Sequence, residues 1–267
     1  MNPIKIIVCA KQVPDPEAPA NLVEIDSDTK MVKIKGLPPG INSYDQNAIE
    51  AALKIKEKTG AKVTVVSVGS KLSQSILRKA LAVGVDDLVL VDDSDFKDLD
   101  SRSTADVLSK AIEKIGEYDL VFTGRQASDW DSGQTGLILG EMLGIPIVNL
   151  VGGVTIEDRS VSVKRMIPGG YERVKGDMPV LLTISNEVGE MRVPSLRTVL
   201  ESRKRPIEVW QSDDLKIDTQ ELNPFEILAL TSPPNMEREC SFIEGDSPEE
   251  RGENLAMTLK KAFLKNN

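Results

Sequence analysis

Residues 124–136 (GRQASDWDSGQTG) carry the side chains and glycines best suited to hold a ligand. This stretch follows an apolar run at residues 118–123, which predicts a buried strand, and precedes a helical pattern at residues 137–143. A helix N-terminus offers unpaired N–H groups and the positive end of a dipole, and Gly133 and Gly136 let the backbone approach a phosphate closely. We therefore predict an anion-binding loop. The alternative is a solvated surface loop that only caps the helix.

The polar side chains of the loop indicate how a phosphate-containing ligand would be held. Asp129 and Asp131 would repel a phosphate that they faced, so we expect them to brace loop N–H groups or to accept hydrogen bonds from ribose hydroxyls. The backbone N–H groups of residues 132–136 would hold the phosphate itself. The further candidates in the loop are Gly124, Arg125, Gln126, Trp130, Ser132, Gln134 and Thr135.

Composition limits the classes of function. The chain has 267 residues, a net charge of −9 and 40% hydrophobic residues, which indicates a folded globular protein without the basic face that nucleic acid requires. No apolar run approaches the length of a membrane span, and residues 1–11 contain one strand-length apolar run rather than a signal peptide. We expect a cytoplasmic protein that binds no nucleic acid and does not insert into a membrane.

The chain contains no histidine, which removes the commonest general base and the usual serine and cysteine triads. Cys9 and Cys240 lie far apart without CxxC spacing, so we expect neither a disulfide nor a metal site. With no catalytic residue to name, we favour a binding or carrier role over hydrolysis.

Strand and helix patterns alternate along the first half of the chain. We expect strands at residues 4–10, 62–68, 87–91 and 118–123, and helices at residues 43–58, 73–82, 101–115 and 137–143. A short hairpin at residues 22–35 would turn at Thr29 and Lys30. This alternation predicts an α/β fold, a doubly wound, mostly parallel sheet of Rossmann-like, nucleotide-binding type with helices on both faces.

Ligands of such sheets bind at the carboxyl ends of the strands, near the point where the strand order reverses. Ala10, Lys11, Val68, Gly69 and the loop that starts at Gly124 all lie at predicted strand ends. We therefore expect them around one crevice.

The pattern changes after Pro146. Short alternating runs at residues 147–150, 154–157, 161–166, 171–174 and 180–184 predict antiparallel additions to one sheet edge. We place a nucleotide-binding domain at residues 1–206, with the antiparallel extension from about residue 147. Residues 207–267, which include Pro233-Pro234 and a last helix from about Ser247, would form a C-terminal arm that packs on a partner.

The sequence resembles the beta subunits of electron transfer flavoproteins over nearly its whole length. Several blocks in order carry the resemblance: residues 8–15 (VCAKQVPD), 42–45 (NSYD), 80–84 (ALAVG), 124–127 (GRQA), 134–136 (QTG), 163–172 (VKRMIPGGYE), 179–183 (PVLLT), 192–196 (RVPSL) and 203–205 (RKR). Similar proteins pair with an alpha subunit that carries FAD, and they transfer electrons between dehydrogenases and acceptors. In them the beta subunit holds a second adenine nucleotide, which is AMP in simple carriers and FAD in those that bifurcate electrons from NADH.

The resemblance implies roles for particular residues. Cofactor contacts are expected from Cys9, Ala10, Lys11, Asn42, Tyr44, Asp45, Val68, Gly69 and the loop residues, with Tyr44 near the flavin of the alpha subunit. Arg125 beside a flavin would lower the free energy of a reduced, anionic ring. The segment 186–193 resembles a loop that docks on acyl-CoA-type dehydrogenases, with Val188 as the anchoring apolar residue beside Met191 and Arg192.

The bifurcating type fits residues 11–15 and 124–126, so we expect FAD in this subunit, with AMP as the alternative. Trp130 and Pro168 depart from that type. Trp130 is either a hydrophobic lid or a base-stacking platform, and Arg125 is either a redox tuner or a surface ion-pair partner. Cys9 would be inert core. Two other functions stay open, a nucleotide-dependent hydrolase or ligase and an adenine-nucleotide sensor that purifies colourless.

Overall fold

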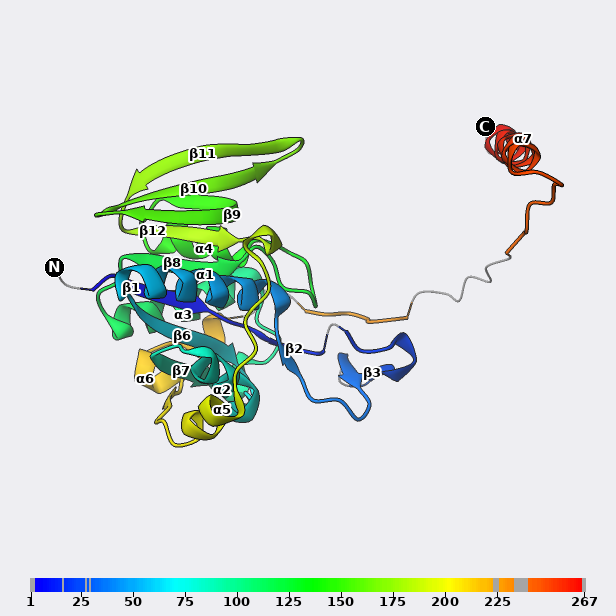
Figure 1. Cartoon of the computed structure of the whole chain (residues 1–267). Coiled ribbons are helices and arrows are strands. Elements are labelled where there is room, and N and C mark those ends of the chain that lie inside the picture. The colour runs from blue at the N-terminus through cyan, green and yellow to red at the C-terminus, as the bar shows by residue number, and fades with distance from the viewer. Residues whose placement is uncertain are drawn as a thin grey trace. The chain divides into compact units, whose positions relative to one another are not determined.

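The structure is a computed structural model that describes residues 3–15, 17–26, 28, 30–222, 226–232 and 240–265. The chain forms two compact units, Met1–Leu230 and Thr231–Asn267. The first unit contains a large sheet with helices on both faces (Figure 1). Among the described residues, no helix combines the length and apolarity needed to cross a membrane.

A nine-stranded sheet forms the centre of the first unit. Its spatial order is β11-β10-β9-β12-β8-β1-β6-β7-β13. The seven strands from β9 to β13 in this order are parallel, whereas β10 is antiparallel to both of its neighbours. The strands are β1 (Lys5–Cys9), β6 (Lys62–Gly69), β7 (Asp87–Asp92), β8 (Leu120–Gly124), β9 (Ile147–Glu157), β10 (Ser160–Ile167), β11 (Gly170–Asp177), β12 (Val180–Ile184) and β13 (Glu208–Trp210).

Helices cover both faces of the sheet, which confirms the predicted doubly wound α/β fold. On one face, α1 (Ser43–Thr59) and α2 (Gln74–Val83) bury apolar side chains against a core that includes Ile6, Val8 and Phe122. On the other face, α3 (Ser101–Ile115) and α4 (Thr135–Met142) pack against Ile7 and Val121. Successive residues of a strand point to opposite faces, which explains why β1 and β8 contribute to both cores.

The strand order reverses between β1 and β8. From β1 the chain proceeds to β6 and β7 on one side, and then returns to place β8 on the other side of β1. The loops that follow the carboxyl ends of β1 and β8 therefore start at the position where this topology favours a ligand.

The second half of the sheet differs from the expectation in two respects. The runs at residues 147–150 and 154–157 are one strand, β9, which passes through Gly152 and Gly153. Strand β12 was expected at an antiparallel edge, but it is parallel and lies between β9 and β8, with all five residues buried. Its unbroken apolar sequence suits a strand that is buried on both faces. The antiparallel prediction holds only for β10 and β11.

Smaller elements complete the two units. Strands β2 (Gln12–Val13) and β5 (Gly40–Ile41) pair, as do β3 (Val23–Asp26) and β4 (Met31–Ile34), whose predicted turn includes Thr29, outside the described residues. The first unit also has α5 (Leu196–Ser202) and α6 (Ser212–Leu215), and the 3-10 turns Ala20–Leu22, Ser94–Phe96, Asn186–Val188 and Thr219–Glu221. Strand β13 and α6 thus belong to this unit although they follow residue 207. The second unit contains α7 (Pro248–Lys265); Pro233-Pro234 lies outside the described residues.

Candidate functional site at the strand order reversal

Asp45, in the first turn of α1, joins the ends of the two strands at the reversal point. Its Oδ2 accepts a hydrogen bond from the backbone N–H of Lys11 at 2.7 Å, and its Oδ1 accepts one from the N–H of Gly124 at 2.9 Å. The carboxyl is almost fully buried, and burial raises its pKa to about 6, although these hydrogen bonds and the Lys11 charge lower it in part. Asp45 therefore fixes the distance between the starts of the two loops.

Gly124 is required where α1 approaches the end of β8. A Cβ atom at this position would lie 2.5 Å from Oδ1 of Asp45 and 2.7 Å from Cβ of Tyr44. Both distances are shorter than real Cβ contacts allow, so a larger residue would push α1 away from the strand. This explains why a glycine begins the loop.

Asn42, the fully buried N-cap residue of α1, holds the loop from the other side. Its Nδ2 donates to the carbonyl of Gln126 at 2.8 Å, and its Oδ1 accepts from the N–H of Ser128 at 3.1 Å. Nζ of Lys11 donates to Oδ2 of Asp129 at 2.6 Å, which links the end of β1 to the loop. Asp129 thus braces the loop through an ion pair with Lys11, and the expected contacts with loop N–H groups or ribose hydroxyls stay predictions.

Arg125 follows the end of β8 and lies against an aromatic ring. Its guanidinium carbon is 4.9 Å from the centre of the Tyr44 ring, which is a cation–π distance. Its Nε donates to Oε1 of Gln126 at 3.2 Å, while Nε2 of Gln126 donates to Oδ1 of Asp131 at 2.8 Å. Among the described residues no carboxylate lies within ion-pair distance of Arg125, although Glu187 is near enough for the charge of Arg125 to help lower the Glu187 pKa.

The start of α4 supplies groups that suit a phosphate. The N-cap residue Gln134 makes no side-chain cap, and Gly133 adopts a positive φ of 62° just before it. The hydroxyls of Ser132 and Ser101 lie 3.0 Å apart, and Ser101 begins α3. Within the described part of the chain, the buried Oγ of Ser128 has no hydrogen-bond partner. The first N–H groups of a helix and the hydroxyls are donors that a nucleotide phosphate requires, and the glycine turn lets the backbone approach it, so the residues present fit such a ligand.

The other residues predicted to contact a cofactor lie at strand ends or on the surface. Cys9 and Ala10 are buried at the end of β1, and burial raises the pKa of the Cys9 thiol, as suits inert core. Val68 and Gly69 end β6 at the same edge of the sheet, where Oε1 of Gln12 accepts from the N–H of Ser73 at 2.6 Å. The Trp130 side chain is 57% exposed, so it is not packed as a lid in this chain alone.

The predicted docking segment, residues 186–193, is held along α1 by polar side chains. Asn47 and Lys54 donate to the carbonyls of Gly189 and Val188 at 2.6 and 2.7 Å. Arg192 donates to both carboxylate oxygens of the buried Glu50, at 3.0 and 2.9 Å, and also binds Glu57. These contacts raise the pKa of Arg192, with the Glu50 hydrogen bond as the largest cause.

Val188 and Met191 are partly buried against the core, whereas Val193 is 91% exposed and Leu196 is 77% exposed. The most exposed apolar side chains near this segment are therefore not those that the sequence analysis named. Glu50 and the contact of Ser101 with the loop could not be identified from the sequence. Glu50 stands in the apolar run at residues 48–53 of the helix, and only the fold shows that it meets Arg192.

Comparisons with known proteins agree with the resemblance seen in the sequence. The family profile described as "Electron transfer flavoprotein domain" matches residues 32–215. The chain is 41% identical over 251 residues to "Electron transfer flavoprotein subunit beta" of Thermoanaerobacterium thermosaccharolyticum, covering 92% of this chain and 94% of that protein. It is 34% identical over 266 residues to "Caffeyl-CoA reductase-Etf complex subunit CarD" of Acetobacterium woodii, covering 98% and 100%. It is also 31% identical over 269 residues to "Protein FixA" of Azotobacter vinelandii, covering 96% and 94%.

Proposed function

Because this chain belongs to the electron transfer flavoprotein family and resembles its beta subunits, we propose that it binds a second FAD at the strand order reversal and carries electrons together with an alpha subunit. The donors would be acyl-CoA-type dehydrogenases, with NADH as a further reductant if the protein bifurcates electrons. The observation that carries the proposal is that Asp45 joins Lys11 and Gly124 at the ends of β1 and β8, beside the uncapped start of α4.

Each part of the site would have a separate task. The free N–H groups at residues 132–136 would hold the phosphates, while the Lys11–Asp129 ion pair would keep the loop in place. Asn42 and Asp45 would fix the distance between the two sides of the crevice. A bound FAD supplies the electron-carrying chemistry.

Arg125 would set the electrostatic environment of the ligand. A cation with no carboxylate in an ion pair stabilises negative charge that develops nearby more than a neutralised cation does. Tyr44 holds the guanidinium in position through its ring. We therefore propose that Arg125 favours electron uptake at this site, and that Arg125→Ala changes the reduction of one flavin more than that of the other.

One relative is named as a subunit of a caffeyl-CoA reductase complex, which supports an enzyme of CoA thioesters as the partner, whereas the electron-bifurcating form of the proposal rests on residues 11–15 and 124–126. The alternative is a simple carrier in which the same loop holds AMP. In that case the site would have a structural role, and the only flavin would be the FAD of the alpha subunit.

The test is a count of released nucleotides after denaturation of the co-purified heterodimer. Two FAD per heterodimer, with flavin absorbance bleached by NADH, are expected. Arg125→Ala should shift one reduction step, whereas Arg203→Ala, an exposed arginine at the end of α5, should not. One FAD and one AMP per heterodimer would contradict the FAD assignment and establish the simple carrier.

The segment at residues 186–193 is proposed as the docking site for the dehydrogenase. Arg192, Asn47 and Lys54 hold its backbone against α1, which leaves Val193 directed to solvent beside Leu196. An exposed apolar side chain on a fixed backbone loses little conformational entropy on binding, which suits a small hot spot in a transient complex.

A further inference from the structure

The loop at residues 124–136 and the proposed docking segment at residues 186–193 leave the sheet side by side. They follow β8 and β12, which are parallel neighbours, and Gly124 pairs in register with Ile184 at the ends of these strands. The backbone N–H of Arg125 donates to the carbonyl of Ile184 at 2.9 Å. The starts of the loop and of the segment are therefore joined by a backbone hydrogen bond.

Helix α1 is attached to both of them. In its first turn, the Tyr44 ring lies with its centre 4.9 Å from the guanidinium carbon of Arg125. Nearly one turn later, Nδ2 of Asn47 donates to the carbonyl of Gly189 in the docking segment at 2.6 Å. Residues three apart are neighbours on the surface of a helix. The guanidinium of Arg125 and the docking segment thus share one support.

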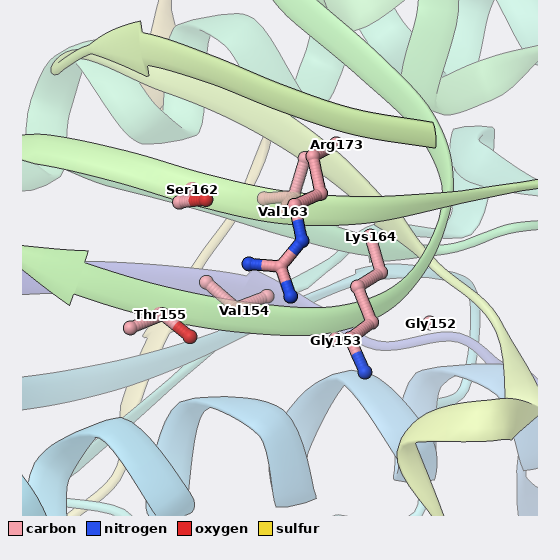
Figure 2. A pocket seen from close by; sticks show the side chains of 8 residues that line it. All are labelled: Gly152, Gly153, Val154, Thr155, Ser162, Val163, Lys164 and Arg173. Atoms are coloured by element: carbon pink, nitrogen blue, oxygen red, sulfur yellow. The ribbon is translucent and has the colours of Figure 1, made fainter. Parts of the chain in front are cut away.

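A glycine of β9 makes room for Glu187, which lies in the turn Asn186–Val188 at the start of the docking segment. A Cβ atom at Gly152 would lie 3.1 Å from Cβ of Glu187 and 2.7 Å from Sδ of Met166. Figure 2 shows Gly152 next to Gly153 on β9. A larger residue than glycine would displace the turn, so the close approach of β9 helps to fix the backbone of Glu187.

Glu187 and Arg125 attract each other without forming an ion pair. A hydrogen bond with the Ser185 hydroxyl lowers the pKa of Glu187 most, and the charge of Arg125 lowers this pKa further. Among the ion pairs of the described residues there is none between Glu187 and Arg125, whose guanidinium lies against the Tyr44 ring and donates to Gln126. The positive charge of Arg125 is therefore not neutralised, and it stays available to a ligand.

We propose that Glu187 is a positioning residue that acts on the nucleotide site through Arg125. Its carboxylate attracts the guanidinium toward the docking segment, whereas the negative charge of a bound nucleotide attracts the same guanidinium toward the loop. Glu187 and the nucleotide thus compete for one cation. Because Glu187 belongs to the docking segment, nucleotide binding and dehydrogenase docking influence each other reciprocally. This inference rests on the proposed nucleotide site but not on whether that site holds FAD or AMP.

The test measures nucleotide affinity in the purified heterodimer after its nucleotide has been removed. AMP and FAD are titrated separately into the wild type and into Glu187→Gln, which removes the charge and keeps the side-chain length. We expect the dissociation constant of the nucleotide to fall about threefold in Glu187→Gln at low salt, and this difference to shrink at high salt. Glu187→Asp keeps the charge and should stay close to the wild type. With FAD bound, Glu187→Gln should also make one flavin easier to reduce.

Glu190→Gln is the matched control, since it makes the same charge change at another exposed position of the docking segment. It should leave the dissociation constant unchanged. The Arg125→Ala background separates an effect through Arg125 from a direct one. If Glu187 acts through Arg125, Glu187→Gln has no effect in this background, and the two substitutions are not additive. Thermal midpoints equal to that of the wild type show that the variants are folded.

Two results would overturn the inference. One is a nucleotide dissociation constant that is the same for Glu187→Gln and the wild type at low salt. The other is an effect of Glu187→Gln that is equally large in the Arg125→Ala background, which would mean that Glu187 acts on the nucleotide directly. A wild-type heterodimer that binds neither AMP nor FAD would contradict the proposed function as well, whereas the first two results leave that function intact.

Discussion

At the scale of single residues, Asp45 is a buried acid that links two strand ends and a helix. Its pKa is raised from 3.8 to about 6, chiefly by burial, so the folded state holds its proton more strongly than the unfolded state does. The contribution of Asp45 to stability is therefore greatest at low pH and falls as pH rises from about 4 to about 6. Compared with an Asp whose pKa does not change on folding, Asp45 lowers the free energy of unfolding by about 3 kcal/mol at neutral pH.

Because the pKa of Asp45 is raised on folding, the effect of Asp45→Asn on stability should depend on pH. The variant carries no charge at any pH, and it loses one of the two backbone hydrogen bonds because its amide NH₂ cannot accept. Its stability deficit relative to the wild type should thus be larger at pH 4.5 than at pH 7, as measured by urea unfolding of the heterodimer. Asp213→Asn, an exposed substitution on α6, should show no such difference. A larger deficit at pH 7 would mean that the ionised form stabilises the fold.

Gly124 gives a second prediction at this scale. Gly124→Ala places a methyl group 2.5 Å from Asp45 Oδ1 and 2.8 Å from the backbone carbon of Tyr44, so either α1 or β8 must move. We expect a loss of about 1–3 kcal/mol in the free energy of unfolding together with weaker nucleotide retention. Gly176→Ala is the matched control, because no atom lies within 4 Å of its added Cβ. Equal stability of the two variants would show that α1 adjusts without cost.

Sequence reasoning identified many of the residues that contact one another in the site, but not the contacts themselves. Gly124 follows a predicted strand, so its place at the carboxyl ends of the strands could be predicted, whereas Asn42 and Asp45 were expected near the ligand only from the family resemblance. That Asp45 binds both Lys11 and Gly124 could not be predicted, because the partners are separated by 34 and 79 residues in the chain. Such pairs depend on the sheet order, which local sequence does not determine.

At the scale of elements, α1 holds the proposed docking segment, residues 186–193, along one of its faces. Asn47, Glu50 and Lys54, which are spaced three and four residues apart, all contact residues 188–192. Glu50 is buried and shares both of its oxygens with Arg192, so the ion pair is shielded from solvent. The position of the segment is therefore fixed before any dehydrogenase binds.

Substitutions in the segment should separate docking from folding. Val193→Ser removes the exposed apolar side chain, and we expect it to raise the apparent KM for the dehydrogenase several-fold with an unchanged Tm. Val188→Ala should instead lower the stability by about 1 kcal/mol, because Val188 packs against the core. Steady-state electron transfer and thermal unfolding of both variants test this. If Val188→Ala impairs transfer and Val193→Ser does not, Val188 is the anchor, as the sequence alone indicated.

The periodicity of apolar residues predicted the helices better than the strands of the second half of the sheet. Helices α1 and α3 have regular apolar faces and were predicted within a few residues of their observed ends. Strand β9 was divided in the prediction because Gly152 and Gly153 usually mark a turn, yet β9 continues through them beside Met166 and Lys164. Strand β12 was assigned to the wrong edge, since its neighbours β8 and β9 are specified by long-range packing.

At the scale of the whole molecule, the two units differ in how much apolar surface they bury. The first unit has a core on each face of the sheet. In the second unit, α7 exposes Leu255, Leu259 and Phe263 at 45%, 48% and 73%. These residues are spaced four apart and share one side of the helix, which is the pattern of a helix that packs against another protein.

The apolar side of α7 leads to the last prediction, that this helix packs on the partner subunit. Leu255→Ser, Leu259→Ser and Phe263→Ser together should reduce the yield of the heterodimer without lowering the thermal midpoint of the first unit, whose cores they do not enter. Lys260→Ser, on another side of α7, should leave the yield unchanged.

The chain expressed alone should be poorly soluble or depleted of nucleotide, because the apolar side of α7 and any other surface that faces the partner stay uncovered. A monodisperse monomer that retains its full nucleotide without a partner would contradict this prediction, and size-exclusion chromatography with nucleotide analysis distinguishes the two outcomes.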